Sequence, residues 1–199
     1  MAVTIEEVKR LKDLTGVGLT DAKHALEEAG GDFDRALEAM RKKGLTKADK
    51  RGEREASEGI VVTYNHDSRI GVVVELNCET SFVAKTEEFK QLGQDIAMHI
   101  VATNPEFISS DDIPEEVRAS KAKEFKDKVL AEGKPENIAD NIVEGMLNKY
   151  FAESCLMDQP FVKDQDKQVS MLIKEHIAKL GENIVVRKMA RIELGQRNG

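Results

Sequence analysis

Two runs in the first half of the chain alternate apolar and polar residues, and this alternation constrains the fold more than any other feature of the sequence. The apolar phase consists of Ile60, Val62 and Tyr64 in the first run and of Val72, Val74, Leu76 and Cys78 in the second. Residues 65–68, Asn-His-Asp-Ser, are typical of a turn. The pattern therefore predicts a β-hairpin with one apolar face that another element must cover.

A single aromatic residue, Phe82, follows the second run among the polar residues 79–81. It lies in the short crossing between Cys78 and a helical pattern that begins near Thr86, so it does not fall on the apolar phase of a strand or a helix. Aromatic residues make up only 5% of the chain, which makes the position of each one informative. Two interpretations remain open: Phe82 is displayed as an anchor for a partner, or it packs as a staple on the preceding strand.

The rest of the C-terminal part predicts four longer helices and one more strand. The helices are expected at about 87–102, after Pro114, after Pro135 and at about 169–180, and the strand at 183–194. The first helix ends before Pro105 and is expected to cover the hairpin, and Gly133 separates the second and third as a helical hairpin. Residues 155–166 show no regular pattern. These elements together predict an α+β unit.

The N-terminal part predicts a bundle of three short helices. Their boundaries are set by the capping-box pair Thr4 and Glu7, by Gly16, by Thr20, by the glycines at 30–31, by Asp32 and by Gly44. The apolar stripe of the first helix is Ile5, Val8, Leu11 and Leu14. Helices this short do not persist alone in water, so their stripes must pack together. The connection 16–19 is left exposed at one end and suggests a docking surface.

A stretch charged in both signs separates the two parts and contains no large apolar side chain from Thr46 to Ser57. This composition is typical of a solvated linker or a solvated helix. We therefore expect a three-helix module at 1–46, a charged linker at 47–57 and an α+β core at 58–199.

Composition and charge narrow the classes of function. The chain is 40% hydrophobic and 34% charged, which fits a globular protein, and its net charge of -7 disfavours direct binding to nucleic acid or to an anionic membrane. No apolar run reaches membrane-spanning length and the first residues lack the features of a secretory leader, so we expect a cytoplasmic protein. Cys78 and Cys155 lie on apolar stretches and are expected to be reduced, buried thiols, although a bridge between them stays open.

Sequence signatures of enzymatic chemistry are weak. The chain contains no phosphate-binding loop and no pair of histidines one helical turn apart, and its four histidines are widely spread, so we expect neither cofactor nor metal and no catalytic residues. A thiol-dependent enzyme built on Cys78 remains an alternative, but nothing nearby in the sequence would lower the pKa of that thiol. A plain binding adaptor, which would need the three-helix bundle but not Phe82, is a second alternative.

Several segments together closely resemble the bacterial elongation factor Ts family. They are Leu11 to Gly18, Asn77 to Lys85, Ile96 to His99, Gln159 to Val162 and Lys174 to His176. The match covers nearly the whole chain, in a short form that carries a single core half. The resemblance implies a guanine-nucleotide exchange factor for elongation factor Tu that makes and breaks no bond in a substrate and is therefore not an enzyme. It also implies a ubiquitin-associated-like N-terminal bundle followed by an α+β dimerisation core.

The resemblance assigns three groups of residues to partner binding. They are the wedge residues Thr80, Ser81, Phe82 and Val83, the N-terminal residues Val17, Gly18, Leu19 and Thr20, and the turn residues His66 and Asp67. In the family the wedge inserts its Phe between helices of elongation factor Tu and disturbs the Mg²⁺ site there. Ser81 stands where the family commonly shows Asp, so the ionic part of this contact differs here. A single core half exposes an edge strand, so we also expect a homodimer.

Overall fold

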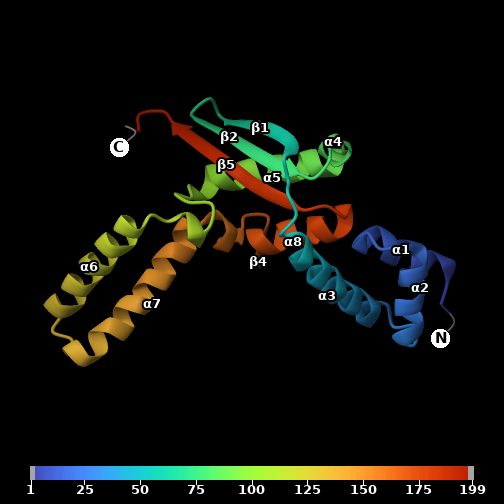
Figure 1. The fold of residues 1–199 in the computed structure, drawn as a ribbon, viewed down its shortest axis with the longest axis horizontal. Helices are drawn as coiled ribbons and strands as arrows, with labels where there is room; N and C mark the ends of the chain where they lie inside the picture. The colour runs from blue at the N-terminus through green and yellow to red at the C-terminus, as the bar shows by residue number, and fades with distance from the viewer. Residues whose placement is uncertain (1–2, 197–199) are drawn as a thin grey trace.

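The computed structural model describes residues 3–196 and shows a mixed α+β fold, as expected (Figure 1). Its centre is a three-stranded antiparallel sheet in the order β1-β2-β5, formed by β1 (Glu58–His66), β2 (Ile70–Cys78) and β5 (Ile184–Glu193). Helix α5 (Glu87–Thr103) packs against β1 and β2 on one face. The predicted hairpin, its covering helix and the final strand are all confirmed.

The hairpin keeps its register because one face is buried. Val62 pairs with Val74, and both lie in the main core with Phe89, Leu92 and Ile96 of α5. A slip of one residue would move this apolar set to the open face of the sheet. The connecting turn adopts positive φ angles at Asp67 (50°) and Ser68 (56°), which match the twist of the two strands.

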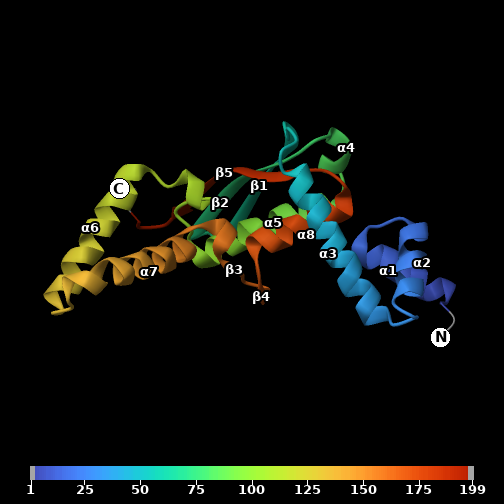
Figure 2. The ribbon, with the colours of Figure 1, turned by 60° about the horizontal axis from the view of Figure 1, so that its bottom comes forward.

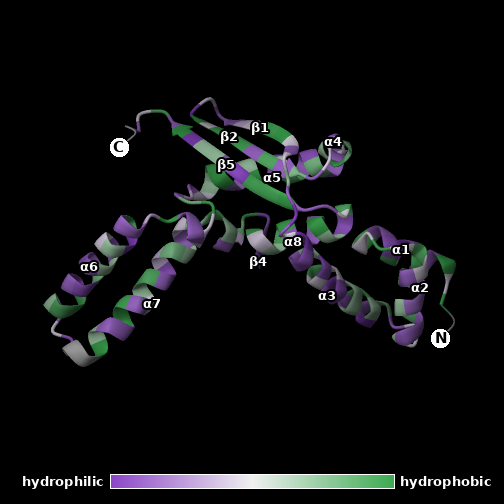
Figure 3. Cartoon of the chain, in the orientation of Figure 1, coloured by the Kyte–Doolittle hydropathy of each residue, from purple (hydrophilic) through white to green (hydrophobic). Residues whose placement is uncertain are grey.

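Helices α6 (Glu115–Ala131) and α7 (Glu136–Ser154) form the predicted helical hairpin, which projects away from the sheet (Figures 1 and 2). Hydrophobic and hydrophilic segments alternate along both helices (Figure 3). Val129 of α6 and Val143 of α7 are buried in a small cluster between them. A short 3-10 helix, η1 (Ser110–Asp112), lies between α5 and α6.

The stretch after α7 is more regular than the sequence indicates. It contains the 3-10 helix η2 (Leu156–Asp158) and a two-stranded sheet of β3 (Pro160–Phe161) and β4 (Asp164–Gln168). The expectation of irregular structure from 155 to 166 is wrong because β4 is polar and largely exposed, so it carries no alternation to detect. Helix α8 (Val169–Leu180) then follows as predicted.

The N-terminal helices are α1 (Ile5–Thr15), α2 (Leu19–Glu28) and α3 (Phe33–Arg51). Helix α2 begins two residues earlier than expected, because Gly18 rather than Thr20 occupies its N-cap. The caps predicted at Thr4 and Asp32 are confirmed. Leu11 and Leu26 are fully buried in the bundle. Ile5 and Leu14 are 75% and 50% exposed, so the prediction that they pack with the rest of the first stripe is wrong.

Helix α3 does not end at Gly44 but continues to Arg51, so residues 47–51 of the expected linker are helical. Gly44 serves close packing instead of a helix end, since a Cβ at this position would lie 3.1 Å from Cβ of Ala178 on α8. Ala48 on the same helix is buried in the main core. Helix α3 therefore seats the N-terminal bundle on α8, at the end of the sheet opposite the α6–α7 hairpin (Figure 2).

Within the described residues, no helix combines the length and the apolar character needed to cross a membrane.

Candidate partner-binding site

Phe82 lies shortly after the hairpin on a one-turn helix, α4 (Ser81–Ala84). The residue is 84% exposed. Ala84 is buried and Val83 is half-buried against the main core, so these two residues occupy the inner side of α4. The interpretation of Phe82 as a staple on the preceding strand is wrong, because the ring is not packed in its own protein. Its predicted exposed position is confirmed.

Four residues cannot hold a helix together in water, so α4 depends on its attachments. On its C-terminal side, the hydroxyl of Thr86 donates to the carbonyl oxygen of Val83 (2.8 Å) and accepts from the N–H of Phe89 (3.2 Å). On its N-terminal side, Cys78 Sγ contacts the carbonyl oxygen of Thr80 at 3.2 Å. The helix is thus fixed between β2 and the start of α5.

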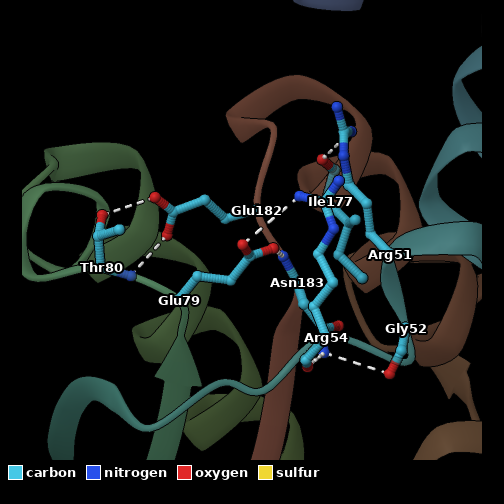
Figure 4. A network of polar contacts seen from close by, with 8 residues as sticks. All are labelled: Arg51, Gly52, Arg54, Glu79, Thr80, Ile177, Glu182 and Asn183. Carbon is cyan, nitrogen blue, oxygen red and sulfur yellow. Dashed lines mark hydrogen bonds and ion pairs between the residues drawn. The ribbon is translucent and has the colours of Figure 1, made fainter.

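A carboxylate from a distant part of the chain holds the first residue of the crossing. Glu182, in the loop between α8 and β5, accepts from the N–H of Thr80 (2.9 Å) and from its hydroxyl (2.6 Å) (Figure 4). The two residues are 102 positions apart. No periodicity or motif marks Glu182, which is why sequence reasoning missed it.

A second carboxylate makes the reciprocal contact. Glu79 Oε1 accepts from the N–H of Asn183 at 2.7 Å, and its Oε2 lies 3.5 Å from Nη1 of Arg54 (Figure 4). The side-chain amide of Asn183 donates to the carbonyl oxygens of Arg54 (2.7 Å) and Gly52 (3.3 Å). These contacts tie the segment after α3 to the base of α4.

The N-terminal residues assigned to binding surround the start of α2. Leu19 is its first residue and is 51% exposed, and Gly18 and Thr20 are also exposed. Val17 is half-buried and packs against the bundle, so it supports this surface more than it forms it. The N-terminal helices and α4 lie at the same end of the molecule (Figures 1 and 2).

The turn residues His66 and Asp67 lie at the other end of the hairpin. Both are exposed, and His66 Nε2 is 3.8 Å from Asp67 Oδ2. The strand β2 that separates this turn from α4 has nine residues, which corresponds to roughly 26 Å. The structure therefore brings together two of the three assigned groups at one end of the sheet and leaves the third at the other.

The buried thiols and histidine have structural surroundings. Cys78 and Cys155 are free, so no bridge joins them. Burial raises the pKa of the Cys78 thiol, and that of Cys155 to about 11, which disfavours the thiolate that a nucleophile needs. His99 is fully buried, and its Nε2 lies 2.9 Å from Oε1 of Gln159. Among the side chains that the structure describes, those of residues 3–135 and 138–196, no cluster of three or more His, Cys, Asp or Glu could hold a metal ion.

Comparison with known proteins gives a consistent result over nearly the whole chain. The model of the family described as elongation factor TS matches residues 47–196. Elongation factor Ts of Thermodesulfovibrio yellowstonii is 50% identical over 196 residues, which cover 98% of both chains. Elongation factor Ts of Syntrophomonas wolfei is 50% identical over 195 residues, covering 98% of this chain and 91% of the relative. That of Thermosipho melanesiensis is 46% identical over 195 residues and is covered completely.

Proposed function

Since the chain belongs to the elongation factor Ts family of translation elongation factors, we propose that it binds elongation factor Tu and promotes the release of GDP from it. The observation that carries this proposal is the display of Phe82 on an anchored helix. The ring is 84% exposed, yet the backbone beneath it is held by Glu182, Thr86 and the buried Ala84. A rigidly presented aromatic side chain is the usual anchor of a protein interface.

Exchange requires only that the factor bind the nucleotide-free partner more tightly than the GDP-bound partner, because linkage then weakens GDP binding by the same factor. In the proposed mechanism Phe82 enters the nucleotide domain of elongation factor Tu and displaces residues that hold Mg²⁺. The metal neutralises phosphate charge, so its displacement leaves the phosphates of GDP poorly compensated and speeds their release. Thr80, Ser81 and Val83 shape the base of this wedge.

The test of the wedge is the replacement Phe82→Ala, with Leu130→Ala at the tip of α6 as a matched exposed control. We expect Phe82→Ala to cost about 2 to 4 kcal/mol of binding or an equivalent loss of exchange, the range of a central aromatic anchor. The melting temperature should stay unchanged, because the ring does not pack in the interior. Release of fluorescent GDP from elongation factor Tu measures the effect, and unchanged release by the Phe82 variant would refute the wedge.

We propose a second contact at Val17, Gly18, Leu19 and Thr20, with Leu19 as its apolar centre. Leu19→Ala is expected to weaken binding to elongation factor Tu, whereas Ile5→Ala, which removes a more exposed apolar side chain from the same bundle, is not. Equilibrium titration of both variants distinguishes them. Equal affinities would show that the bundle has some other role. His66 and Asp67 are proposed to meet another domain of the partner.

The division into a docking module at 1–46, a connection at 47–57 and an exchange core at 58–199 is part of the proposal. The contacts of α3 with α8 favour a module that is docked on the core over one that moves on a free tether. A plain adaptor would use the bundle and would not need Phe82, so the Phe82→Ala experiment also separates these two functions.

We further propose that the core pairs with a second copy of the chain. The sheet face turned away from α5 exposes Val61 (68%) and Ile192 (67%), with Val73 between them on the central strand. Strands β1 and β5 are both edges of the sheet. A sheet face that exposes these apolar side chains beside open edges is a surface that a second sheet can cover.

A further inference from the structure

The crossing that presents Phe82 begins with an unusual cap. Thr80 is the N-cap residue of α4, but its side chain makes no hydrogen bond to the helix that it precedes. Its hydroxyl and its N–H both donate to the carboxylate of Glu182 instead. In a capping box, a Glu inside the helix accepts from the N–H of the cap residue. Here the corresponding position of α4 is the apolar Val83, and a residue 102 positions away takes the place of that Glu.

Glu182 is itself held in position by its neighbours. It follows Gly181, whose φ of 82° ends α8, and it precedes Asn183, whose N–H donates to Glu79. Two carboxylate-to-amide contacts therefore run in opposite directions between the same pair of segments, 79–80 and 182–183 (Figure 4). Hydrogen bonds to an ionised carboxylate are stronger than neutral ones, so this pair fixes both the distance and the orientation of the two segments.

The loop that contains Glu182 directly follows α8, the helix on which the N-terminal bundle packs. The guanidinium of Arg51 donates to the carbonyl oxygen of Ile177 (3.2 Å), and Nζ of Lys174 lies 2.7 Å from Oδ1 of Asp49. Both partners on α8 lie within three turns of Glu182. The end of α8 thus contacts the bundle on one side and the base of α4 on the other.

We propose that Glu182 is a positioning residue for the Phe82 wedge, acting through Thr80. This inference rests on the proposed exchange function. Without the carboxylate, α4 keeps its attachment to α5 but loses the fixed point at its start, so the ring samples more directions. The partner then selects the productive direction from a broader set, which slows the exchange step more than it weakens docking.

The principal variant is Glu182→Ala, with Glu175→Ala as a control that removes a carboxylate of α8 bound to Lys167. At saturating factor, we expect the maximal rate of GDP release to fall about tenfold for Glu182→Ala, while the half-saturating concentration changes less than about twofold. Glu182→Gln should restore part of the rate, because its amide can accept from the N–H of Thr80. Glu175→Ala should retain the full rate.

A second readout measures position directly. The sequence contains no Trp, so Phe82→Trp places the only tryptophan of the chain at the wedge, where its fluorescence can be excited selectively. Adding Glu182→Ala should lower the fluorescence anisotropy of this ring and speed hydrogen exchange at the N–H of Thr80. If Glu182→Ala does not fold, Thr80→Val removes the hydroxyl donor and is tested in the same way. Unchanged anisotropy and unchanged exchange of the Thr80 amide would overturn the inference.

The two hypotheses fail in different ways. If Phe82→Ala slows GDP release and Glu182→Ala does not, the positioning role is wrong and the exchange function stands. If Phe82→Ala has no effect on release, the wedge is wrong, and the inference that rests on it falls as well. A parallel fall in rate and in melting temperature for Glu182→Ala would assign Glu182 to stability and also overturn the positioning role.

Discussion

Phe82 and Phe89 lie seven residues apart and have opposite environments. Phe89 is fully buried and Phe82 is 84% exposed. Phe89 belongs to the apolar stripe of α5, whereas the inner side of α4 is already occupied by the smaller Ala84 and Val83. Leaving an aromatic ring in water forgoes about 2 kcal/mol or more of burial free energy. The free energy that folding does not gain at Phe82 remains available for association with a partner.

At the same scale, the two thiols are expected to resist alkylation. Burial raises the pKa of both, and the negative charge of Glu182 raises that of Cys78 further. The thiolate is the reactive form, so native protein treated with iodoacetamide at about pH 8 should gain no adduct, whereas protein in urea should gain two. Intact-mass measurement counts the adducts. Rapid labelling of Cys78 in the native protein would contradict this prediction and would support the alternative of a thiol-dependent enzyme.

At the scale of elements, His99 joins α5 to the small β3–β4 sheet. Its Nε2 lies 2.9 Å from Oε1 of Gln159, and its Nδ1 accepts from the N–H of Val162 at 3.3 Å. Both contacts are satisfied by a neutral ring that carries its proton on Nε2. A second proton would have to occupy Nδ1, where the N–H of Val162 already points. The junction therefore prefers the uncharged histidine.

This preference gives a prediction for stability against pH. Burial lowers the pKa of His99 below its ordinary value of 6.5, and the hydrogen bond to Gln159 opposes this only in part. Below about pH 6.5 the unfolded chain takes up a proton that the folded chain resists, so the free energy of unfolding must fall as the pH decreases. Melting temperatures between about pH 7.5 and 5.5 should fall less steeply for His99→Gln than for the wild type.

His24→Gln is the matched control, because His24 lies exposed on α2. The melting temperature of the His24→Gln variant should change with pH as that of the wild type does. An unchanged slope for His99→Gln would contradict the assignment of this titration to His99.

Elements with strong periodicity could be predicted from the sequence, and elements defined by distant contacts could not. The helix α5 carries a regular stripe and a cap at Thr86, so both its existence and its start follow from local chemistry. The strand β4 is polar throughout, and its pairing with β3 leaves no local trace. Gly44 has the chemistry of a helix end, but its packing against Ala178 keeps α3 helical. The residues around Phe82 left its exposure open and the family resemblance favoured it, whereas the attachment of Thr80 to Glu182 depends on a contact across the fold.

At the scale of the whole molecule, two helical units extend from the central sheet on opposite sides (Figure 1). The α6–α7 hairpin has its own small apolar clusters, and the N-terminal bundle has another. The bundle also makes a close backbone contact with the core. A Cβ on Gly16 would lie 2.5 Å from Cα of Lys179 and 2.7 Å from its carbonyl oxygen. The orientation of the bundle on α8 therefore requires glycine at this position.

Gly16→Ala tests this contact between the bundle and α8, and Gly30→Ala is a closely matched control. Both glycines have a φ of 67°, but a Cβ on Gly30 would meet nothing within 4 Å. Gly30→Ala should cost about 1 kcal/mol of stability from backbone strain alone. Gly16→Ala should cost more and should also weaken binding to elongation factor Tu, because it displaces the Leu19 surface relative to α4. Urea unfolding and titration measure the two effects, and equal behaviour of the two variants would show that this contact is unimportant.

The proposed pairing of two chains depends on the open face of the sheet. Val73 lies at its centre, opposite Thr63 of β1 and Ala190 of β5. We expect sedimentation to give twice the chain mass of 22.1 kDa for the wild type and the single mass for Val73→Lys, since an unpaired charge at this central point is costly to bury between two sheets. Leu130→Lys on α6 should remain dimeric. A wild-type chain that sediments as a monomer would contradict the pairing while leaving the wedge intact, because Phe82 lies beyond the end of β2 and not on this face.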